Sequence, residues 1–173
     1  MQVLAIIGLS VLAAITYGII HDQITARICV EYFTIGHARL IDSESPTVLG
    51  LFWGVVATWW VGLPLGAGLA VAARAGVRPK LDASDLLPSL TRLLMVMFAF
   101  AALAGLTGFA ASRSGVFTLS GPLASKVPQD RHVAFLTCGW AHSASYLAGL
   151  LGGVGLWILT WHRRSRLPVE RLI

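Results

Sequence analysis

The chain has 173 residues, of which 56% are hydrophobic and 12% are charged, and its formal net charge at pH 7 is +5. Soluble proteins carry about 25% charged residues, so this composition excludes an ordinary soluble domain and indicates a single membrane domain covering residues 1–173. The basic residues gather at the ends of apolar stretches and do not form one patch, so we expect no nucleic-acid partner.

Four stretches contain no charged side chain, and they cover about 3–20, 48–73, 93–111 and 133–161. An α-helix rises about 1.5 Å per residue, so about 20 residues cross the ~30 Å hydrocarbon core of a bilayer. The first stretch has no basic residues before it and no small-residue cleavage pattern after it, which favours a retained span over a secretory signal. The sequence therefore predicts an all-α integral membrane protein, a four-transmembrane-helix bundle whose main partner is the lipid bilayer.

A polar segment, residues 21–37, follows the first apolar stretch directly. Neither Gly nor Pro interrupts it until residue 36, so the helix is expected to continue to about Cys29 and to place Tyr17, His21 and Thr25 on one face. Residues 28–35 are rich in β-branched and aromatic side chains, so a short strand or a re-entrant extended piece competes with helix there.

The second apolar stretch follows residues 42–46, Asp-Ser-Glu-Ser-Pro, a pattern typical of a helix start. Pro64 lies within this span and predicts a kink there. Glycine pairs at G-x-x-x-G spacing let helices approach closely, and they occur at Gly50/Gly54, Gly62/Gly66 and Gly149/Gly153. These glycine faces are candidate contacts with a second copy of the chain or with another membrane protein.

The fourth stretch carries two polar side chains inside the predicted membrane region, His142 and Tyr146. They share one stripe with other residues that we expect to face the bundle interior, namely His132, Phe135, Gly139, Gly149 and Gly153. An imidazole facing hydrocarbon would lack a partner, so His142 is expected to bond a neighbouring helix, with a path for protons, an ion or a cofactor as the alternative. A haem is not expected, because only His21 could supply a second axial histidine.

Only two cysteines are present, Cys29 and Cys138, so no disulfide framework is expected. Cys138 falls inside the fourth apolar stretch, whereas Cys29 follows the first one. We interpret both as small buried hydrophobic side chains. A single disulfide is the alternative, and it would require both residues to lie near an oxidising face.

The basic residues also predict an orientation. With four spans, the termini lie on the same side as the loop between the second and third stretches. That side carries Arg74, Arg78, Lys80, Arg92, Arg163, Arg164, Arg166 and Arg171, and the other side carries Arg27, Arg39, Arg113, Lys126 and Arg131. The positive-inside bias therefore predicts a multi-pass protein with both termini in the cytoplasm and the polar segment facing outward.

The strongest candidates for function are ionisable residues on the outward side, His21, Asp22, Glu31, His37 and His132. Ionisable groups beside lipid are costly and are by default candidates for function. Histidine and carboxylate side chains bind transition metals, so a Zn, Fe, Mn or Cu ion held by these residues is the candidate cofactor, while the sequence itself leaves the cofactor unassigned. The apolar residues around Glu31 are expected to hold that segment against the bundle, so that all five side chains converge.

Spacing alone does not identify such a site, because the sequence contains neither H-E-x-x-H nor E-x-x-H. In the alternative interpretation, Glu31 pairs with Arg27 one helical turn earlier, and His37 and His132 bond water or lipid head groups. No nucleophilic triad, phosphate loop or dinucleotide fingerprint stands out, so catalytic residues stay unassigned.

Two parts of the polar segment resemble a pattern found in other proteins. Residues 21–27 read H-D-Q-x-T-x-R, and residues 31–37 read E-Y-F-T-x-x-H. This pattern resembles that of small, uncharacterised bacterial membrane proteins. The resemblance implies a bacterial inner-membrane protein and carries no activity with it.

Two functional interpretations follow from these features. In the first, the protein is a small membrane enzyme or metal-binding protein with an outward-facing site of histidine and carboxylate side chains. In the second, it is a non-catalytic component, either a transporter or channel subunit or an assembly partner that packs through its glycine faces. The first predicts that the candidate side chains lie within ligand distance, and the second predicts that they turn toward solvent or into salt bridges.

Overall fold

The computed structural model describes residues 1–167, and every regular element in that part of the chain is helical. In chain order the elements are α1 (Gln2–Ile28), α2 (Glu31–Thr34), α3 (Pro46–Val56), α4 (Trp59–Arg74), α5 (Ala83–Arg113), α6 (Pro122–Lys126), the 3₁₀ helix η1 (Gln129–Arg131) and α7 (His132–Arg164). Four segments are long and apolar enough to cross a membrane: α1, α3 with α4, α5, and η1 with α7. The predicted all-α class with four candidate spans is confirmed. Arg171, which entered the orientation prediction, lies outside the described residues.

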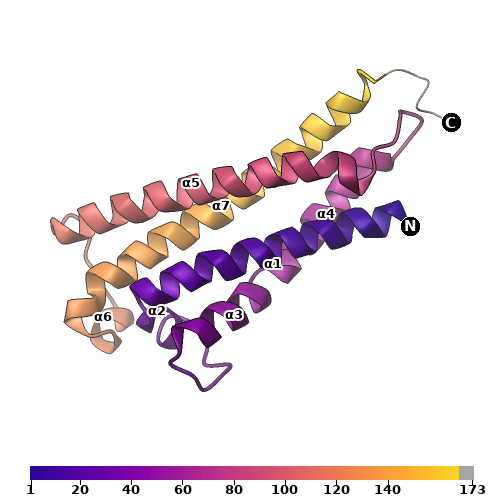
Figure 1. The fold of residues 1–173 in the computed structure, drawn as a ribbon. Helices are drawn as coiled ribbons and strands as arrows, with labels where there is room; N and C mark the ends of the chain where they lie inside the picture. Colours follow the sequence, from indigo (N-terminus) through magenta and orange to yellow (C-terminus); the bar gives the residue numbers. More distant parts are fainter. Residues whose placement is uncertain (168–173) are drawn as a thin grey trace.

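The long helices form a bundle in which α1 lies along α3 and α4, while α5 lies along α7 (Figure 1). Contacts between α4 and α7 and between α1 and α5 join these two pairs. The N-terminus and the end of α7 lie at one end of the bundle, and α2, α3 and α6 lie at the other (Figure 1). Separate apolar clusters form in the two halves: Ile6, Leu69 and Leu86 belong to one, and Phe33 and Leu49 belong to the other.

Glycines set the close approach of α1 to α3. A Cβ atom at Gly54 would lie 2.5 Å from the Ile19 backbone, and one at Gly18 would lie 2.5 Å from the Gly54 carbonyl oxygen. A Cβ at Gly50 would lie 3.0 Å from the carbonyl of Asp22. These glycines therefore act as the G-x-x-x-G spacing predicts, but α1 of the same chain occupies their face.

The second span is interrupted at a different place from the predicted one. Helix α3 ends at Val56 and α4 begins at Trp59, whereas Pro64 lies inside α4. The Thr58 hydroxyl donates to the Gly54 carbonyl at 2.5 Å, the acceptor that the Thr58 backbone amide would use in a continuous helix. That amide instead donates to the Val55 carbonyl at 3.3 Å. The prediction that the chain bends because of Pro64 missed this break.

The region after α1 corrects a second local expectation. Helix α1 continues to Ile28, as predicted, but residues 28–35 contain the short helix α2 and no strand. No strand lies beside this segment among the described residues, so its backbone bonds are made locally; the amides of Phe33 and Thr34 both donate to the Val30 carbonyl at 3.0 Å. The predicted helix start at residues 42–46 is confirmed, because the Ser45 hydroxyl accepts from the Val48 amide.

Arg164 fixes the end of the bundle near the termini. Its side chain is fully buried, and its guanidinium donates to four backbone carbonyls at 2.7–3.0 Å. Those carbonyls belong to Ala72, Ala75, Arg78 and Pro79 and lie at the end of α4 and in the loop that follows. The guanidinium thus supplies donors to carbonyls that a helix end leaves unpaired.

Replacing Gly54 with Ala is expected to destabilise the fold by about 1–3 kcal/mol, because the new methyl group would overlap the α1 backbone and force α1 away from α3. Gly155→Ala is the matched control, since nothing lies within 4 Å of a Cβ at that helical position. Heat unfolding of the detergent-purified protein, followed by size-exclusion chromatography, should show a lower midpoint for Gly54→Ala alone. Equal midpoints for the two variants would contradict the close packing.

Candidate metal centre

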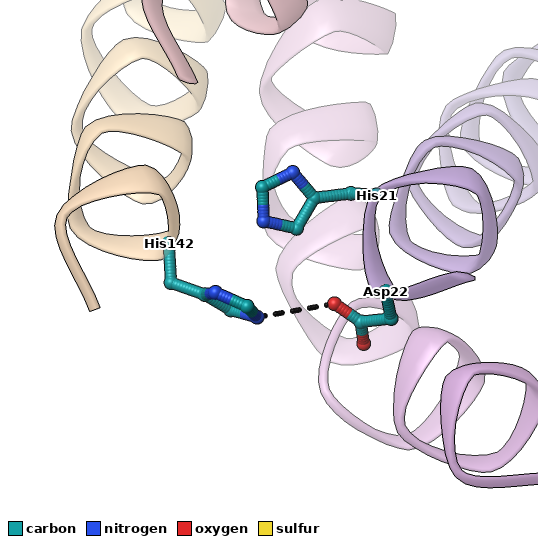
Figure 2. Close-up of side chains that lie close together, drawn as sticks. All are labelled: His21, Asp22 and His142. Atoms are coloured by element: carbon teal, nitrogen blue, oxygen red, sulfur yellow. Dashed lines mark hydrogen bonds and ion pairs between the residues drawn. The ribbon is translucent and has the colours of Figure 1, made fainter. Parts of the chain in front are cut away.

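Three ionisable side chains meet inside the bundle, from α1 and α7. His21, Asp22 and His142 are 6%, 5% and 7% exposed, and one potential ligand atom from each lies within 4.8 Å of the others. Figure 2 shows the two imidazoles and the carboxylate pointing toward one another across the space between the helices. Two imidazoles and a carboxylate buried together form a typical metal-binding set.

The local sequence explains why α1 places two of these groups in the interior. Tyr17, His21 and Thr25 are all buried on one face of α1, as their spacing predicts. Asp22 is adjacent to that face, and Gly50 of α3 packs directly against its backbone carbonyl. A larger residue at position 50 would displace the α1 backbone at Asp22, so the glycine holds the carboxylate in place.

The hydrogen bonds of His142 determine where its protons lie. The ring Nδ1 lies 2.8 Å from the Cys138 carbonyl oxygen, which can only accept, so Nδ1 carries a proton. The other ring nitrogen, Nε2, lies 3.1 Å from the Asp22 carboxylate. If the imidazole were neutral, its Nε2 lone pair would face an ionised carboxylate, and the two would repel each other. A proton or another cation must therefore lie between Nε2 and the carboxylate.

His21 presents a free nitrogen to the same place. Its Nδ1 lies 3.5 Å from the Ser145 hydroxyl, and that hydroxyl lies 2.6 Å from the Tyr17 hydroxyl. The His21 Nε2 is buried and forms no hydrogen bond within the part of the chain that the structure describes. A buried nitrogen without a partner is costly, which favours a donor or a cation at this position.

Glu31 is not part of this cluster. Its carboxylate accepts from the Arg131 guanidinium at 3.1 Å and from the Cys29 thiol at 3.3 Å. The alternative interpretation, in which Glu31 pairs with Arg27, is wrong, because α1 ends at Ile28 and the two residues do not share a helix. Arg27 instead donates to Gln23 and to the Thr47 hydroxyl, whose side chain lies on α3.

His132 and His37 also lie apart from the cluster. The His132 Nε2 donates to the Val127 carbonyl at 3.0 Å, and the His37 Nδ1 donates to the Tyr32 carbonyl at 2.8 Å. The ring centroid of His37 is 6.4 Å from that of His142. The structure therefore keeps His21 and Asp22 of the five candidate ligands together and adds His142. The expected hydrogen bond of His142 to a neighbouring helix is confirmed by its contact with Asp22 of α1.

Two other expected features have mixed outcomes. Cys29 and Cys138 are fully buried free thiols, which agrees with their interpretation as buried hydrophobic residues. Burial and the neighbouring Glu31 raise the pKa of Cys29 to about 11, so it remains a thiol at neutral pH. Tyr146 fits its predicted interior stripe only in part: it is 45% exposed, but it lines a cavity between the long helices, and its hydroxyl donates to the Ala57 carbonyl at the break between α3 and α4.

Aromatic side chains cover the centre on the side of α2. The rings of Tyr32 and Phe33 lie 4.6 and 5.8 Å from the His142 ring, and the His37 ring stacks on Phe33 at 5.3 Å. Trp53 of α3 completes the group at 4.7 Å from His37. Burial lowers the pKa of His37 below its usual 6.5, so this imidazole is neutral at neutral pH. The cover is therefore uncharged and largely apolar.

Comparison with known proteins finds no match: no protein-family model, no curated protein and no solved structure is similar to this chain. The chemistry of the centre is thus the basis on which a function can be assigned.

The contact of Glu31 with Arg131 predicts a pH-dependent contribution to stability. Burial raises the pKa of Glu31, but bonds from its own backbone amide, Arg131 and Cys29 outweigh that effect and lower it below the usual 4.5. A carboxyl pKa lowered by folding stabilises the fold above the unfolded-state value, and this stabilisation is lost as the pH falls through the folded-state value. Glu31→Gln should therefore cost about 1 kcal/mol at pH 7, and the difference from wild type should shrink below pH 4.5.

Denaturation midpoints measured between neutral and acid pH would test this expectation. Glu44→Gln is the control, because Glu44 is exposed. A deficit of Glu31→Gln that stays constant down to the lowest pH would show that the ionised carboxylate is not what stabilises the contact.

Proposed function

We propose that the protein is a small membrane metalloprotein that holds a divalent transition metal ion between His21, Asp22 and His142. One observation supports this most directly. The His142 Nδ1 donates to the Cys138 carbonyl, and the His21 Nδ1 lies beside the Ser145 hydroxyl, which is able to accept from it. With Nδ1 protonated in both rings, each histidine has an Nε2 lone pair available to a cation beside the buried carboxylate. Metal-ligating histidines commonly hold the second ring nitrogen in this way.

The separation of the donor atoms suits a transition metal. Bonds of about 2.0–2.2 Å allow two ligand atoms to lie at most about 4.4 Å apart across a metal. The three donors lie within 4.8 Å of one another, so small side-chain rotations bring them to bonding distance. A cation there would also replace the proton that His142 and Asp22 otherwise have to share.

Three protein ligands suit a reactive centre better than a structural one. Structural zinc sites have four protein ligands, whereas catalytic zinc sites keep an open position for water or substrate. Two histidines and a carboxylate are also the ligands of non-haem iron(II) oxygenases. We therefore infer an enzyme-type centre that holds Zn or Fe and polarises an oxygen atom of a bound water or substrate.

A non-catalytic role has its own supporting observation. The 3.1 Å contact between His142 and Asp22 joins α1 to α7 without any metal if a proton lies between them. In that case the pair serves to hold the bundle together, as in a transporter subunit or an assembly partner. His21 separates the two functions, because its free Nε2 contributes to a metal site but not to this contact.

His21→Ala is expected to weaken zinc binding by more than about 100-fold, because losing even a second-shell partner of a metal site costs about 10–100-fold. His142→Ala and Asp22→Asn should have the same effect, whereas His132→Ala should keep full metal content, since His132 bonds a backbone carbonyl elsewhere. Metal content after dialysis, measured by plasma mass spectrometry, gives the first readout. The second is the rise in unfolding midpoint on adding zinc, which binding to the folded state alone produces.

A different set of results would contradict the metal function. If wild type and His21→Ala retain equally little zinc, and zinc does not raise the midpoint of either, the metal function is wrong. A fall in stability of Asp22→Asn and His142→Ala, with His21→Ala unaffected, would then identify the polar contact between α1 and α7 as the role of these residues.

The proposal includes a location: a bacterial inner membrane, with both termini in the cytoplasm and the metal centre nearer the outer face. Cysteines placed at the exposed positions Glu44 and Ser84, in a background lacking Cys29 and Cys138, test it. A membrane-impermeant thiol reagent added to intact cells should label position 44 and not position 84, because the positive-inside bias places the loop before α5 in the cytoplasm. Labelling of position 84 alone would reverse the orientation.

A further inference from the structure

A cavity of about 100 Å³ lies between the long helices and begins at the proposed metal centre. Asp22, His142 and Ser145 line it at one end, and Ser10 and Trp157 line it at the other. Twelve residues separate Asp22 from Ser10 on α1, which corresponds to about 18 Å along the helix. A volume of this size spread over such a length makes a narrow space.

The wall between the two ends is almost entirely hydrocarbon. Large apolar side chains from α4, α5 and α7 form most of it, including Leu65, Leu93, Leu94, Met97 and Leu156. Small residues such as Ala13 and Gly149 leave the space open. A space with such walls favours apolar molecules over water, because water along them would find few hydrogen-bond partners.

The carboxylate and the imidazole that line the cavity lie at one end, and that end is covered on the side of α2. The Ser10 hydroxyl and the Trp157 indole at the other end already donate to the backbone carbonyls of Ile6 and Leu65. At the covered end, Tyr32 and Phe33 pack against His142, and neither of them lines the cavity. The free space beside the Asp22 carboxylate therefore continues into the apolar part of the bundle. A molecule that reaches the centre through it has to be soluble in the bilayer.

We propose that this cavity holds the unbranched aliphatic chain of a membrane-dissolved molecule, with an oxygen-bearing head group at the metal centre; this rests on the proposed function. The narrow shape selects an extended chain over a ring system. The single polar end selects a molecule with one head group, such as a carboxylate or an alcohol. The open coordination positions of a three-ligand ion would receive the head-group oxygen. The substrate class is thus a fatty acid or fatty alcohol.

Binding of radiolabelled decanoic acid to zinc-loaded protein in lipid nanodiscs tests the proposal. Wild type should bind it saturably, above the partition into empty nanodiscs, and Ala13→Leu should weaken binding at least tenfold by filling the cavity. Gly155→Leu is the matched control, because that position is open, with nothing within 4 Å of its Cβ. If Ala13→Leu does not fold, Leu94→Phe serves as the second variant, because its larger side chain narrows the cavity from α5. Absence of saturable binding, or equal binding by the filled variant, would overturn the proposal.

The direction of the chain gives a second readout. Decanoic acid with bromine on its last carbon should quench Trp157, whose indole donates to the Leu65 carbonyl and lines the far end of the cavity. Quenching in wild type should therefore exceed that in Trp157→Phe, and Ala13→Leu should abolish the difference. Equal quenching in wild type and Trp157→Phe would contradict a chain that lies along the cavity.

Metal content separates this proposal from the one on which it rests. Ala13→Leu should retain zinc, because Ala13 provides no ligand, so lost decanoate binding with unchanged zinc supports the chain site itself. Asp22→Asn should lose zinc and bind decanoate more weakly than wild type. If wild type binds decanoate saturably but retains no zinc, the metal function and the head-group contact fail, and the chain site stands.

Discussion

The fold depends on one constraint: a carboxylate and two imidazoles lie in an apolar interior, where each needs a partner. An unpaired charge in such surroundings is strongly unfavourable, so Asp22 has to be matched by a proton or a cation shared with His142. These groups come from α1 and α7, which otherwise pack mainly on different neighbours, α3 and α4 for α1 and α5 for α7. The need of these groups for partners fixes the position of α1 along the axis of α7 more narrowly than apolar packing alone would.

Other contacts make that meeting possible. The glycines of α3 let α1 approach closely, and Gly50 holds the backbone at Asp22. The turn after α1 brings Tyr32 and Phe33 over His142, and the contact of Glu31 with Arg131 ties that turn to the start of α7. Glu31, a candidate metal ligand in the sequence, therefore ties the covering turn to α7 and lies outside the cluster formed by α1 and α7.

The sequence predicted the four apolar helices, the buried face of α1 and the helix start at residues 42–46, because each follows from composition or local periodicity. It did not predict which ionisable residues meet, because it grouped His21 with His132 and the other outward-facing candidates and left His142 out of that group. Helix α1 continues seven residues past His21, about 10 Å, so His21 lies deeper, and His142 lies about 15 Å along α7 from His132. His21 and His142 therefore lie at similar depths. The predicted extension of α1 to Cys29 already indicated that His21 lies well inside the helix end. The contact of Glu31 with Arg131 joins residues 100 positions apart, and no local pattern predicts it.

The surroundings of the centre differ on its two sides, and this difference bears on selectivity. Toward α2 the centre meets neutral aromatic rings, whereas toward the termini it opens into an apolar space that ends near Trp157 and Ser10. Apart from Asp22 and His142 at the centre itself, no ionisable Asp, Glu, His, Lys or Arg side chain of residues 1–167 lines that space, so a ligand there would be selected by length and width and by the chemistry of its one polar end. A methylene group in an apolar pocket is worth about 1–3 kcal/mol, so shape can discriminate among chains of different length. Ala13 and Gly149 line the space and leave it open, so selectivity for chain length and width would depend on residues whose side chains have no reactive group.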